Sequence, residues 1–318
     1  MNPEEIKARL TAFRDKLPSS TMPFIVSETQ VRAQETKDVL ALLSQNNSVL
    51  LVGLQRTGKT SVLRAVHDAL PGSLMAFITT KTEDEGQLTN EIEKLLDKEF
   101  ESLDAALVEW RNKFPEAAII MDEIGNYEKA DLEWLNNLAK KYHKVVVGLA
   151  VVGKKHFEIH AILTEFHDVE PIIVKPFTNA EVRGMIAKIS KGTGVKVDSD
   201  YLYFATNGVP YLVLTLLYNI SAYLINNPQE ATVEGDTVCI LGEDFEKLKK
   251  STLWVIEGWS NIFQSFAGML KAQLPFIKKE DFDIPDSSMA KFLVKSGIIE
   301  KTSKGKYRIK GSYIREFL

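Results

Sequence analysis

The sequence predicts an α/β fold: a parallel sheet comes first, and a helical part and a small helix–hairpin module follow it. Three observations indicate this. Over residues 21–177 short apolar runs alternate with amphipathic stretches, which is typical of parallel strands joined by crossover helices. Over residues 178–240 strand-like runs stop and helical periodicity continues. Over residues 241–318 the sequence predicts helices followed by a hairpin with its turn at Lys304-Gly305, and this order is typical of a winged helix.

In the first region the runs predict five strands, at residues 50–54, 73–79, 117–122, 144–152 and 169–174. The intervening stretches predict helices at about residues 28–44, 87–114 and 131–142, with one more directly after the first strand. A short charged amphipathic helix at residues 3–17 precedes them and ends at Pro18. We therefore expect an N-terminal helix over residues 1–20 and a sheet domain over residues 21–177.

The second region predicts three helices and no strand. Thr178 and Glu181 form a capping box that opens a helix to about Lys191, and a second helix spans residues 199–206. The third is the most apolar window of the chain, residues 209–225, where polar residues such as Asn219 interrupt the run. This favours a buried core helix over a membrane span. The polar, turn-rich residues 226–242 are expected to be a domain boundary, followed by helices at 243–250, 252–274 and 288–295.

Composition sets limits on the environment and the partners. A formal net charge of -4 and a pI near 5.9 argue against a protein that coats nucleic acid by bulk charge. The single cysteine, Cys239, excludes an internal disulfide and fits a reducing compartment. The N-terminus carries acids before any apolar stretch, unlike a secretory signal. We expect a cytoplasmic protein that does not insert into membranes.

The central motif joins the first strand to the next helix. Gly-x4-Gly-Lys-Thr after an apolar strand is typical of a phosphate-binding loop, because glycines let backbone N–H groups turn toward an anion at the helix N-terminus. Lys59 is expected to reach the β- and γ-phosphates of a nucleotide, and Thr60 to complete the ligand shell of Mg²⁺. The nucleotide-binding residues predicted here are Gly53, Leu54, Gln55, Arg56, Thr57, Gly58, Lys59, Thr60 and Ser61.

A second motif ends the third strand. Asp122 and Glu123 follow an apolar run, so both carboxylates are expected at the carboxyl end of a buried parallel strand, where open α/β sheets bind ligands. Asp122 is the expected Mg²⁺ ligand, directly or through water. Glu123 is the expected base that orients the attacking water. Together with Lys59 these residues predict hydrolysis of ATP to ADP and phosphate.

Four segments make the chain resemble the archaeal-type P-loop ATPase family of the STAND clade, which is related to AAA+ and origin-recognition ATPases. They are the phosphate loop at residues 53–61, Lys175–Glu181, Asn207–Leu212 and the hairpin region at residues 296–309. The resemblance implies an ASCE/AAA+-like P-loop core, a helical lid over residues 178–240 and a C-terminal winged helix over residues 241–318. It also implies that Pro210, in the Gly-x-Pro motif of the lid, lies near the nucleotide.

The chain departs from that family in two places. Residues 24–28 stand where the family often carries a Gly-Arg box, and they contain no arginine. The fourth strand ends without the polar or basic residue that usually lies near the γ-phosphate, and Lys154 or Lys155 is the nearest substitute. Hydrolysis is therefore expected to be slow or to need a group from a partner. A GTPase is disfavoured because no Asn-Lys-x-Asp segment is present.

A basic patch lies on the predicted winged helix. Residues 291–318 contain eight lysines and arginines but only two glutamates. The candidate DNA-contacting residues are Lys291, Lys295, Lys304, Lys306 and Arg308. A solvated lysine surface or a protein-docking module explains the same pattern.

Two further clusters favour structural roles. His156, His160 and His167 lack a cysteine or acid that would complete a zinc site. The aromatic residues at helical spacing, Trp254, Trp259, Phe263 and Phe266, favour core packing over base stacking.

These features predict an ATP-binding, Mg²⁺-dependent switch ATPase. Its nucleotide state would change the lid angle and reposition the winged helix. Two outputs stay open. Either the winged helix acts on DNA, or the winged helix and lid bind a protein effector, with slow or no hydrolysis. Self-association of the chain also stays open.

Overall fold

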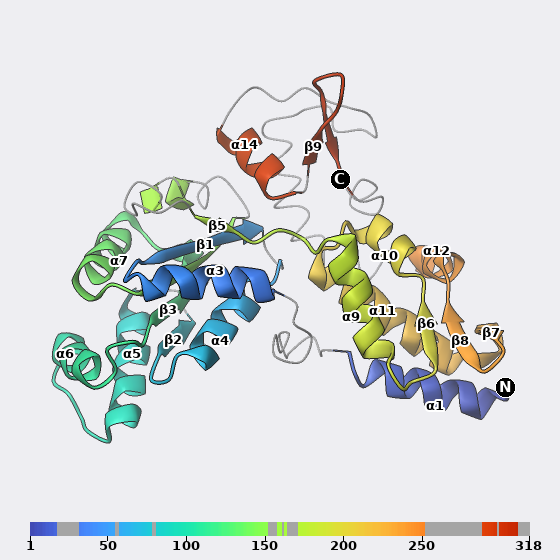
Figure 1. The fold of residues 1–318 in the computed structure, drawn as a ribbon, viewed down its shortest axis with the longest axis horizontal. Helices are drawn as coiled ribbons and strands as arrows, with labels where there is room; N and C mark the ends of the chain where they lie inside the picture. The colour runs from blue at the N-terminus through green and yellow to red at the C-terminus, as the bar shows by residue number, and fades with distance from the viewer. Residues whose placement is uncertain are drawn as a thin grey trace. The chain divides into compact units, whose positions relative to one another are not determined.

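The computed structural model describes residues 1–17, 32–54, 57–77, 81–151, 158–160, 162–163, 171–251, 288–297 and 299–310. The chain divides into two compact units (Figure 1). The core unit is Ile25–Val174, and the lid unit combines Met1–Phe24 with Lys175–Leu318. The chain thus starts in the lid unit, builds the core unit and then returns, so the core unit is an insertion in the sequence of the lid unit.

The core unit is built on one parallel sheet, as the sequence predicts. Its strands are β1 Val49–Leu54, β2 Leu74–Phe77, β3 Ile119–Asp122, β4 Val145–Val151 and β5 Ile172–Ile173, in the order β2-β3-β4-β1-β5. All four strand pairs are parallel. Because the strands are parallel, the phosphate loop after β1 and Asp122 of β3 lie at the same, carboxyl end of the sheet, with only β4 between the two strands.

The helices of the core unit are α3 Ala33–Ser44, α4 Lys59–Ala69, α5 Lys81–Leu96, α6 Leu103–Lys113 and α7 Lys129–Tyr142, with the 3₁₀ turn η1 Ile124–Asn126 after β3. The prediction of one helical stretch over residues 87–114 was wrong, because it contains a break. Asp97 has a left-handed φ of 52°, and the Ser102 side chain accepts a hydrogen bond from the Ala105 N–H at 3.3 Å, which caps α6.

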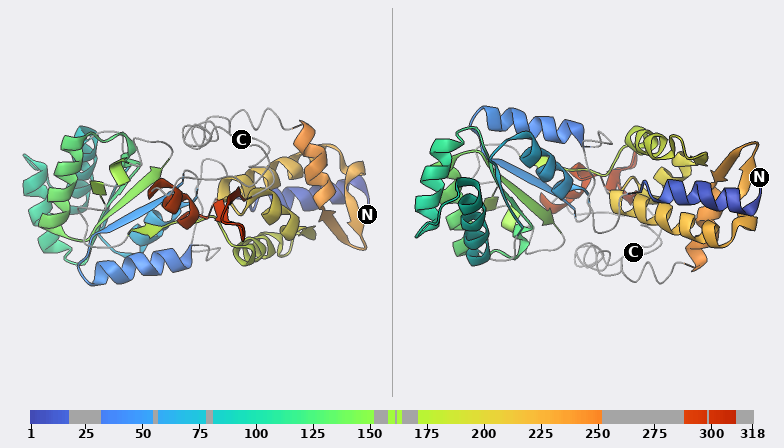
Figure 2. Two further views of the ribbon diagram at one scale, coloured as in Figure 1. Left: turned by 90° about the horizontal axis from the view of Figure 1, so that it is seen from above. Right: turned by 90° about the horizontal axis from the view of Figure 1, so that it is seen from below.

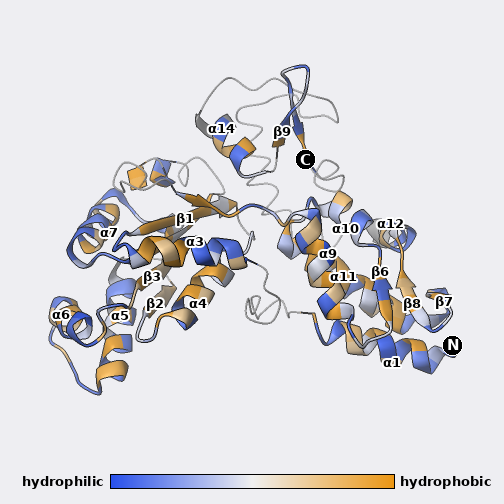
Figure 3. Ribbon diagram, in the orientation of Figure 1, coloured by the Kyte–Doolittle hydropathy of each residue, from blue (hydrophilic) through white to orange (hydrophobic). Residues whose placement is uncertain are grey.

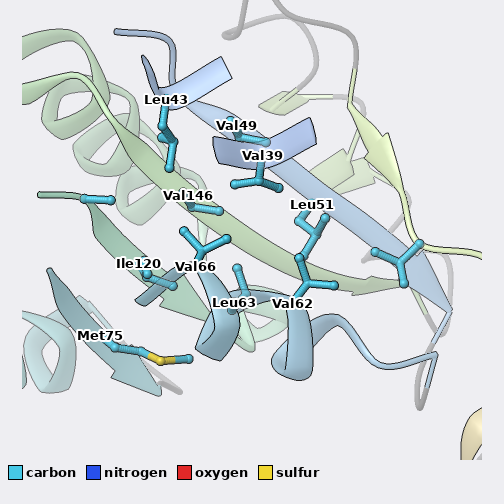
Figure 4. Packing of buried hydrophobic residues seen from close by; sticks show 12 residues of the cluster. Val39, Leu43, Val49, Leu51, Val62, Leu63, Val66, Met75, Ile120 and Val146 are labelled. Carbon is cyan, nitrogen blue, oxygen red and sulfur yellow. The ribbon is translucent and has the colours of Figure 1, made fainter. Parts of the chain in front are cut away.

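Helices α3 and α4 cover one face of the sheet (Figure 4). Val39 from α3 and Val62 and Val66 from α4 pack in one cluster with Leu51 of β1 and Ile120 of β3. The side chains that alternate with these on β1, such as Leu50 and Val52, are buried as well. Since successive strand residues point to opposite faces, both faces of the sheet are covered. The continuous apolar strands of the sequence follow from this double burial.

Strand β2 forms one edge of the sheet, and α5 protects it. The Gln87 side chain accepts from the Phe77 N–H and donates to the Phe77 carbonyl, both at 3.1 Å. One turn later, Glu91 accepts from the Met75 N–H at 2.7 Å. These side chains take the place of a neighbouring strand and block edge-to-edge pairing.

The lid unit contains helices α9 Asn179–Ser190, α10 Ser199–Thr206 and α11 Pro210–Asn226, which confirm the three predicted helices. It also contains a small sheet of β6 Val195–Val197, β7 Thr232–Glu234 and β8 Thr237–Ile240, in the order β6-β8-β7, followed by α12 Gly242–Ser251. The expectation of no strand in this region was therefore wrong, and the domain boundary expected at residues 226–242 stays a prediction. Each strand has three or four residues, which is too short for a two-residue alternation to emerge from the sequence.

The first helix, α1 Pro3–Arg14, packs against α11, and two views draw them side by side (Figures 1 and 2). Leu10 and Phe13 of α1 are fully buried. Helix α11 is strongly apolar (Figure 3) and buries residues such as Leu217 and Ile220. This confirms the prediction of a buried core helix. No helix in the described part of the chain has both the length and the apolarity needed to cross a membrane.

At the C-terminus the structure describes helix α14 Ser288–Lys295 and the antiparallel hairpin of β9 Ile299–Lys301 and β10 Tyr307–Ile309. The helix and hairpin confirm the element order expected here, and the helix expected at residues 252–274 lies outside the described residues. The Asn207 side chain donates to the Gly297 carbonyl at 3.0 Å, between the predicted lid and the predicted winged helix.

Candidate functional site

The phosphate loop runs from the end of β1 to the start of α4, and close packing explains its glycines. A Cβ at Gly53 would lie 2.6 Å from the Val174 carbonyl oxygen. Gly58, the N-cap of α4, has a left-handed φ of 95° that disfavours other residues. Thr57 is buried, and its hydroxyl donates to the Leu54 carbonyl at 2.8 Å. Gln55 and Arg56 lie outside the described residues.

Lys59 begins α4 and turns its side chain back over the loop. Its side chain is only 5% exposed, and Nζ donates to the carbonyl oxygens of Leu54 at 2.8 Å and Gly53 at 3.4 Å. Burial lowers the pKa of the Lys59 ammonium to about 8; the nearby carboxylates of Asp122 and Glu123 act in the opposite direction. A buried ammonium without a direct carboxylate contact among the described residues favours an anionic ligand.

Asp122 and Thr60 are in direct contact. The Thr60 hydroxyl donates to Asp122 Oδ2 at 2.6 Å, and the Glu123 N–H donates to Oδ1 at 2.9 Å. Asp122 is 1% exposed, and burial raises the pKa of its carboxyl group, against the opposing effects of Thr60 and Lys59. Gly148 of β4 makes room for this carboxylate, because a Cβ there would lie 2.6 Å from Oδ1.

Glu123 has an unusual backbone and an exposed side chain. Its φ is 62°, in the left-handed region that non-glycine residues adopt at a cost of roughly 1–3 kcal/mol. The turn sends the chain into η1 and leaves the carboxylate beyond the carboxyl end of β3. Strain of this kind is often kept at functional positions.

The residues present fit a nucleotide and its metal ion. A partly buried hydroxyl–carboxylate pair, Thr60 and Asp122, offers the hard oxygen ligands that Mg²⁺ prefers, beside the ammonium of Lys59. Ser61 is buried in α4 next to them. Pro210 is the first residue of α11 in the lid unit, and its place beside the nucleotide stays a prediction.

The residues of the predicted DNA-binding surface lie on α14 and the hairpin. All five are exposed: Lys291, Lys295, Lys304, Lys306 and Arg308. Phe292 and Leu293 of α14 are buried, so the helix presents its lysines on the side opposite its apolar residues.

The remaining candidates are less informative. His156 and His167, with Lys154 and Lys155, lie outside the described residues, as do the aromatic residues at 254–266. Within the ranges the structure describes, no group of three His, Cys, Asp or Glu side chains could hold a metal ion.

Arg32 is the residue that the sequence reasoning missed. It lies ahead of the loop, four positions beyond the segment 24–28 that lacks an arginine, and its guanidinium donates to the Thr57 carbonyl at 2.5 Å. It also pairs with Glu35 at 2.7 Å. An Arg-x-x-Glu spacing at the start of an amphipathic helix was the available signal, but surface helices carry the same spacing.

Among known proteins, the fold of this chain is similar to those of several solved structures. No family model and no curated protein sequence matches the chain. A Walker-type ATPase of Pyrococcus abyssi aligns with a TM-score of 0.58 and 14% identity, covering 90% of this chain and 95% of that one. Cdc6p from Pyrobaculum aerophilum aligns with a TM-score of 0.50 and 14% identity, covering 96% and 94%. The chain is thus similar in fold to both proteins over nearly its whole length.

Proposed function

We propose that this chain, which has the fold of archaeal Walker-type and Cdc6 ATPases, binds ATP with Mg²⁺ and hydrolyses it as a switch. The observation that carries the proposal is the contact of Thr60 with Asp122 at 2.6 Å beside the buried ammonium of Lys59. An ammonium and a hydroxyl at one helix N-terminus, with a carboxylate in contact with the hydroxyl, are the groups that bind a nucleoside triphosphate and its Mg²⁺.

Each residue has a distinct role in this mechanism. The loop amides and Lys59 bind the β- and γ-phosphates, and Lys59 exchanges its two carbonyl contacts for phosphate oxygens. Thr60 and Asp122 would hold Mg²⁺, which when bound neutralises negative charge on the β- and γ-phosphates. Glu123, exposed next to Asp122, accepts a proton from the attacking water and orients it.

The experiment that tests hydrolysis compares wild type with Glu123→Gln. The amide keeps the shape of the side chain but cannot accept the proton, so we expect ATP binding within about twofold of wild type and turnover reduced about 10²–10⁴-fold. Glu133→Gln, which changes an exposed acid on α7, is the matched control and should turn over normally. Full activity in Glu123→Gln would remove Glu123 from the mechanism, and a wild type that binds no ATP would refute the proposal as a whole.

The switch would act through the segment that leaves the core unit. Val174 donates its N–H to the Val52 carbonyl of β1 at 2.8 Å, and three residues later the Phe177 N–H donates to the Gly208 carbonyl at 2.8 Å. The next residue back, Asn207, binds the Gly297 carbonyl of the predicted winged helix. Short covalent and hydrogen-bonded steps therefore link the strand of the phosphate loop to the C-terminal module.

For the output we favour DNA, because the five exposed basic residues of α14 and the hairpin oppose the net charge of the chain. Duplex binding should weaken steeply as salt rises. Changing Lys291, Lys295 and Lys304 together to alanine should abolish it, whereas the control change of Lys94, Lys113 and Lys140, exposed in the core unit, should not.

The alternative output is a protein effector or a second copy of the chain. It predicts tight ATP binding with slow turnover, and little duplex affinity at any salt concentration. Unchanged duplex affinity in the triple alanine variant of α14 and the hairpin would favour this alternative and remove the DNA assignment.

A further inference from the structure

Arg32 holds its charged group against the phosphate loop. The side chain is 2% exposed, Nη2 donates to the Thr57 carbonyl at 2.5 Å, and Nη1 donates to Glu35 Oε1 at 2.7 Å. A Cβ at Gly58 would lie 3.3 Å from Arg32 Nε. The guanidinium plane therefore lies beside the peptide bond that joins Thr57 to Gly58.

The backbone of Arg32 is in an unfavourable conformation. It is the N-cap of α3 with φ 69° and ψ 16°, a left-handed conformation that disfavours residues with a Cβ. Asparagine or glycine would suit both the conformation and the cap better than arginine, whose side chain makes no capping hydrogen bond and contacts α3 through its ion pair with Glu35. Burial of a guanidinium adds a desolvation cost. A residue that carries both costs is more readily explained by a function than by helix stability.

The geometry of the peptide bond supplies that function. In a trans peptide the carbonyl of one residue and the N–H of the next point in opposite directions. By binding the Thr57 carbonyl, Arg32 directs the Gly58 N–H away from itself. Gly58 is the N-cap of α4, so its amide belongs to the group of N–H donors that the phosphate loop presents to an anion.

We infer that Arg32 is a positioning residue of the phosphate loop, which fixes the Thr57–Gly58 peptide so that the loop amides face the nucleotide phosphates. This inference rests on the proposed nucleotide site. Arg32 acts through the loop backbone, and its effect should depend on the phosphates of the ligand and not on the base.

The test measures the dissociation constants of ATP and of inorganic tripolyphosphate, both with Mg²⁺, for wild type and for Arg32→Met and Arg32→Gly. Arg32→Met keeps the volume of the side chain, and Arg32→Gly suits the left-handed backbone and so protects folding. We expect both ligands to bind about ten- to hundredfold more weakly, the loss expected for a hydrogen bond to a charged group. Arg32→Lys should recover only part of the affinity, because one ammonium cannot reproduce the fork that reaches Thr57 and Glu35.

Each other outcome would overturn the inference. Unchanged affinities for both ligands, even with a lowered melting temperature, would reduce Arg32 to a structural residue of α3. Weaker ATP binding with unchanged tripolyphosphate binding would indicate a contact with the base instead. Lys37→Met, which removes an exposed charge from the same helix, is the control and should bind like wild type. If the wild type binds neither ligand, the proposed nucleotide site itself is refuted. If the wild type binds and the Arg32 variants bind equally well, only the role of Arg32 is refuted.

Discussion

Replacing Lys59 with methionine should remove nucleotide binding and, at the same time, stabilise the nucleotide-free protein. Burial lowers the pKa of Lys59 from 10.5 to about 8, which corresponds to about 3 kcal/mol against the charged ammonium in the folded state. The Leu54 carbonyl keeps a partner in the variant, because the Thr57 hydroxyl also donates to it. Allowing for partial relaxation around the charge, we expect an unfolding free energy about 2 kcal/mol higher at pH 7.

The lowered pKa of Lys59 also predicts how the stability of the wild type changes with pH. The folded protein releases the Lys59 proton near pH 8, whereas the unfolded chain keeps it to about pH 10.5, so the unfolded state binds more protons between these values. Wild-type stability should therefore rise across that window, and the advantage of Lys59→Met should shrink. Urea denaturation of both proteins from pH 7 to pH 10.5 measures this, with Lys37→Met as the exposed control. A variant that is less stable than wild type at every pH would refute the reasoning.

Three further predictions concern other buried positions. Burial, followed by the charges of three neighbouring acids, raises the pKa of Asp84 to about 8. The folded protein then keeps a proton that the unfolded chain loses near pH 4, so the stability of the wild type should fall from pH 4 to pH 8. In urea denaturation, Asp84→Asn should be about 2 kcal/mol more stable than wild type at pH 8 but not at pH 4. Gly148→Ala should lower the unfolding free energy by about 1–3 kcal/mol and reduce ATP turnover, because the added Cβ displaces Asp122. The control Gly86→Ala, with no atom within 4 Å of its added Cβ, should do neither. Thermal melting measures the stability of each variant, and kcat measures its turnover. Leu10→Ala should destabilise the lid unit by about 2–5 kcal/mol, measured by urea denaturation, and leave ATP affinity below the transition unchanged.

The elements that the sequence predicted most clearly share one property: each is a long, continuous run rich in buried apolar residues. Strands β1 and β4 and helix α11 are of this kind, and their apolar residues dominate a window of the sequence. The small sheet of the lid unit fails this condition, since β6 contains one exposed lysine between two valines and pairs with β8 about forty residues away. Long-range pairing of short strands leaves no local pattern to read.

The candidate site shows the same division. The phosphate loop was predictable because its chemistry requires adjacent residues, and the contact of Thr60 with Asp122 follows from parallel strands that end at one edge. Arg32 was not predictable in this way. Its contact with Thr57 spans 25 positions and depends on how α3 enters the core unit. A charged residue ahead of a helix is usually solvated, so only the structure distinguishes this one.

Several unfavourable features of the core unit lie where the nucleotide would bind. Lys59 and Asp122 are buried charged groups, and Arg32, Gly58 and Glu123 all have left-handed backbones. A folded protein retains such costs where a ligand or a reaction depends on them. If phosphates bind at Lys59, they supply the counter-charge that the folded protein lacks there, so binding energy and folding stability become linked. Saturating ATP should then stabilise wild type by about 2.7 kcal/mol at one hundred times its dissociation constant and leave Lys59→Met unchanged, reversing the order of stability that the two proteins have without nucleotide.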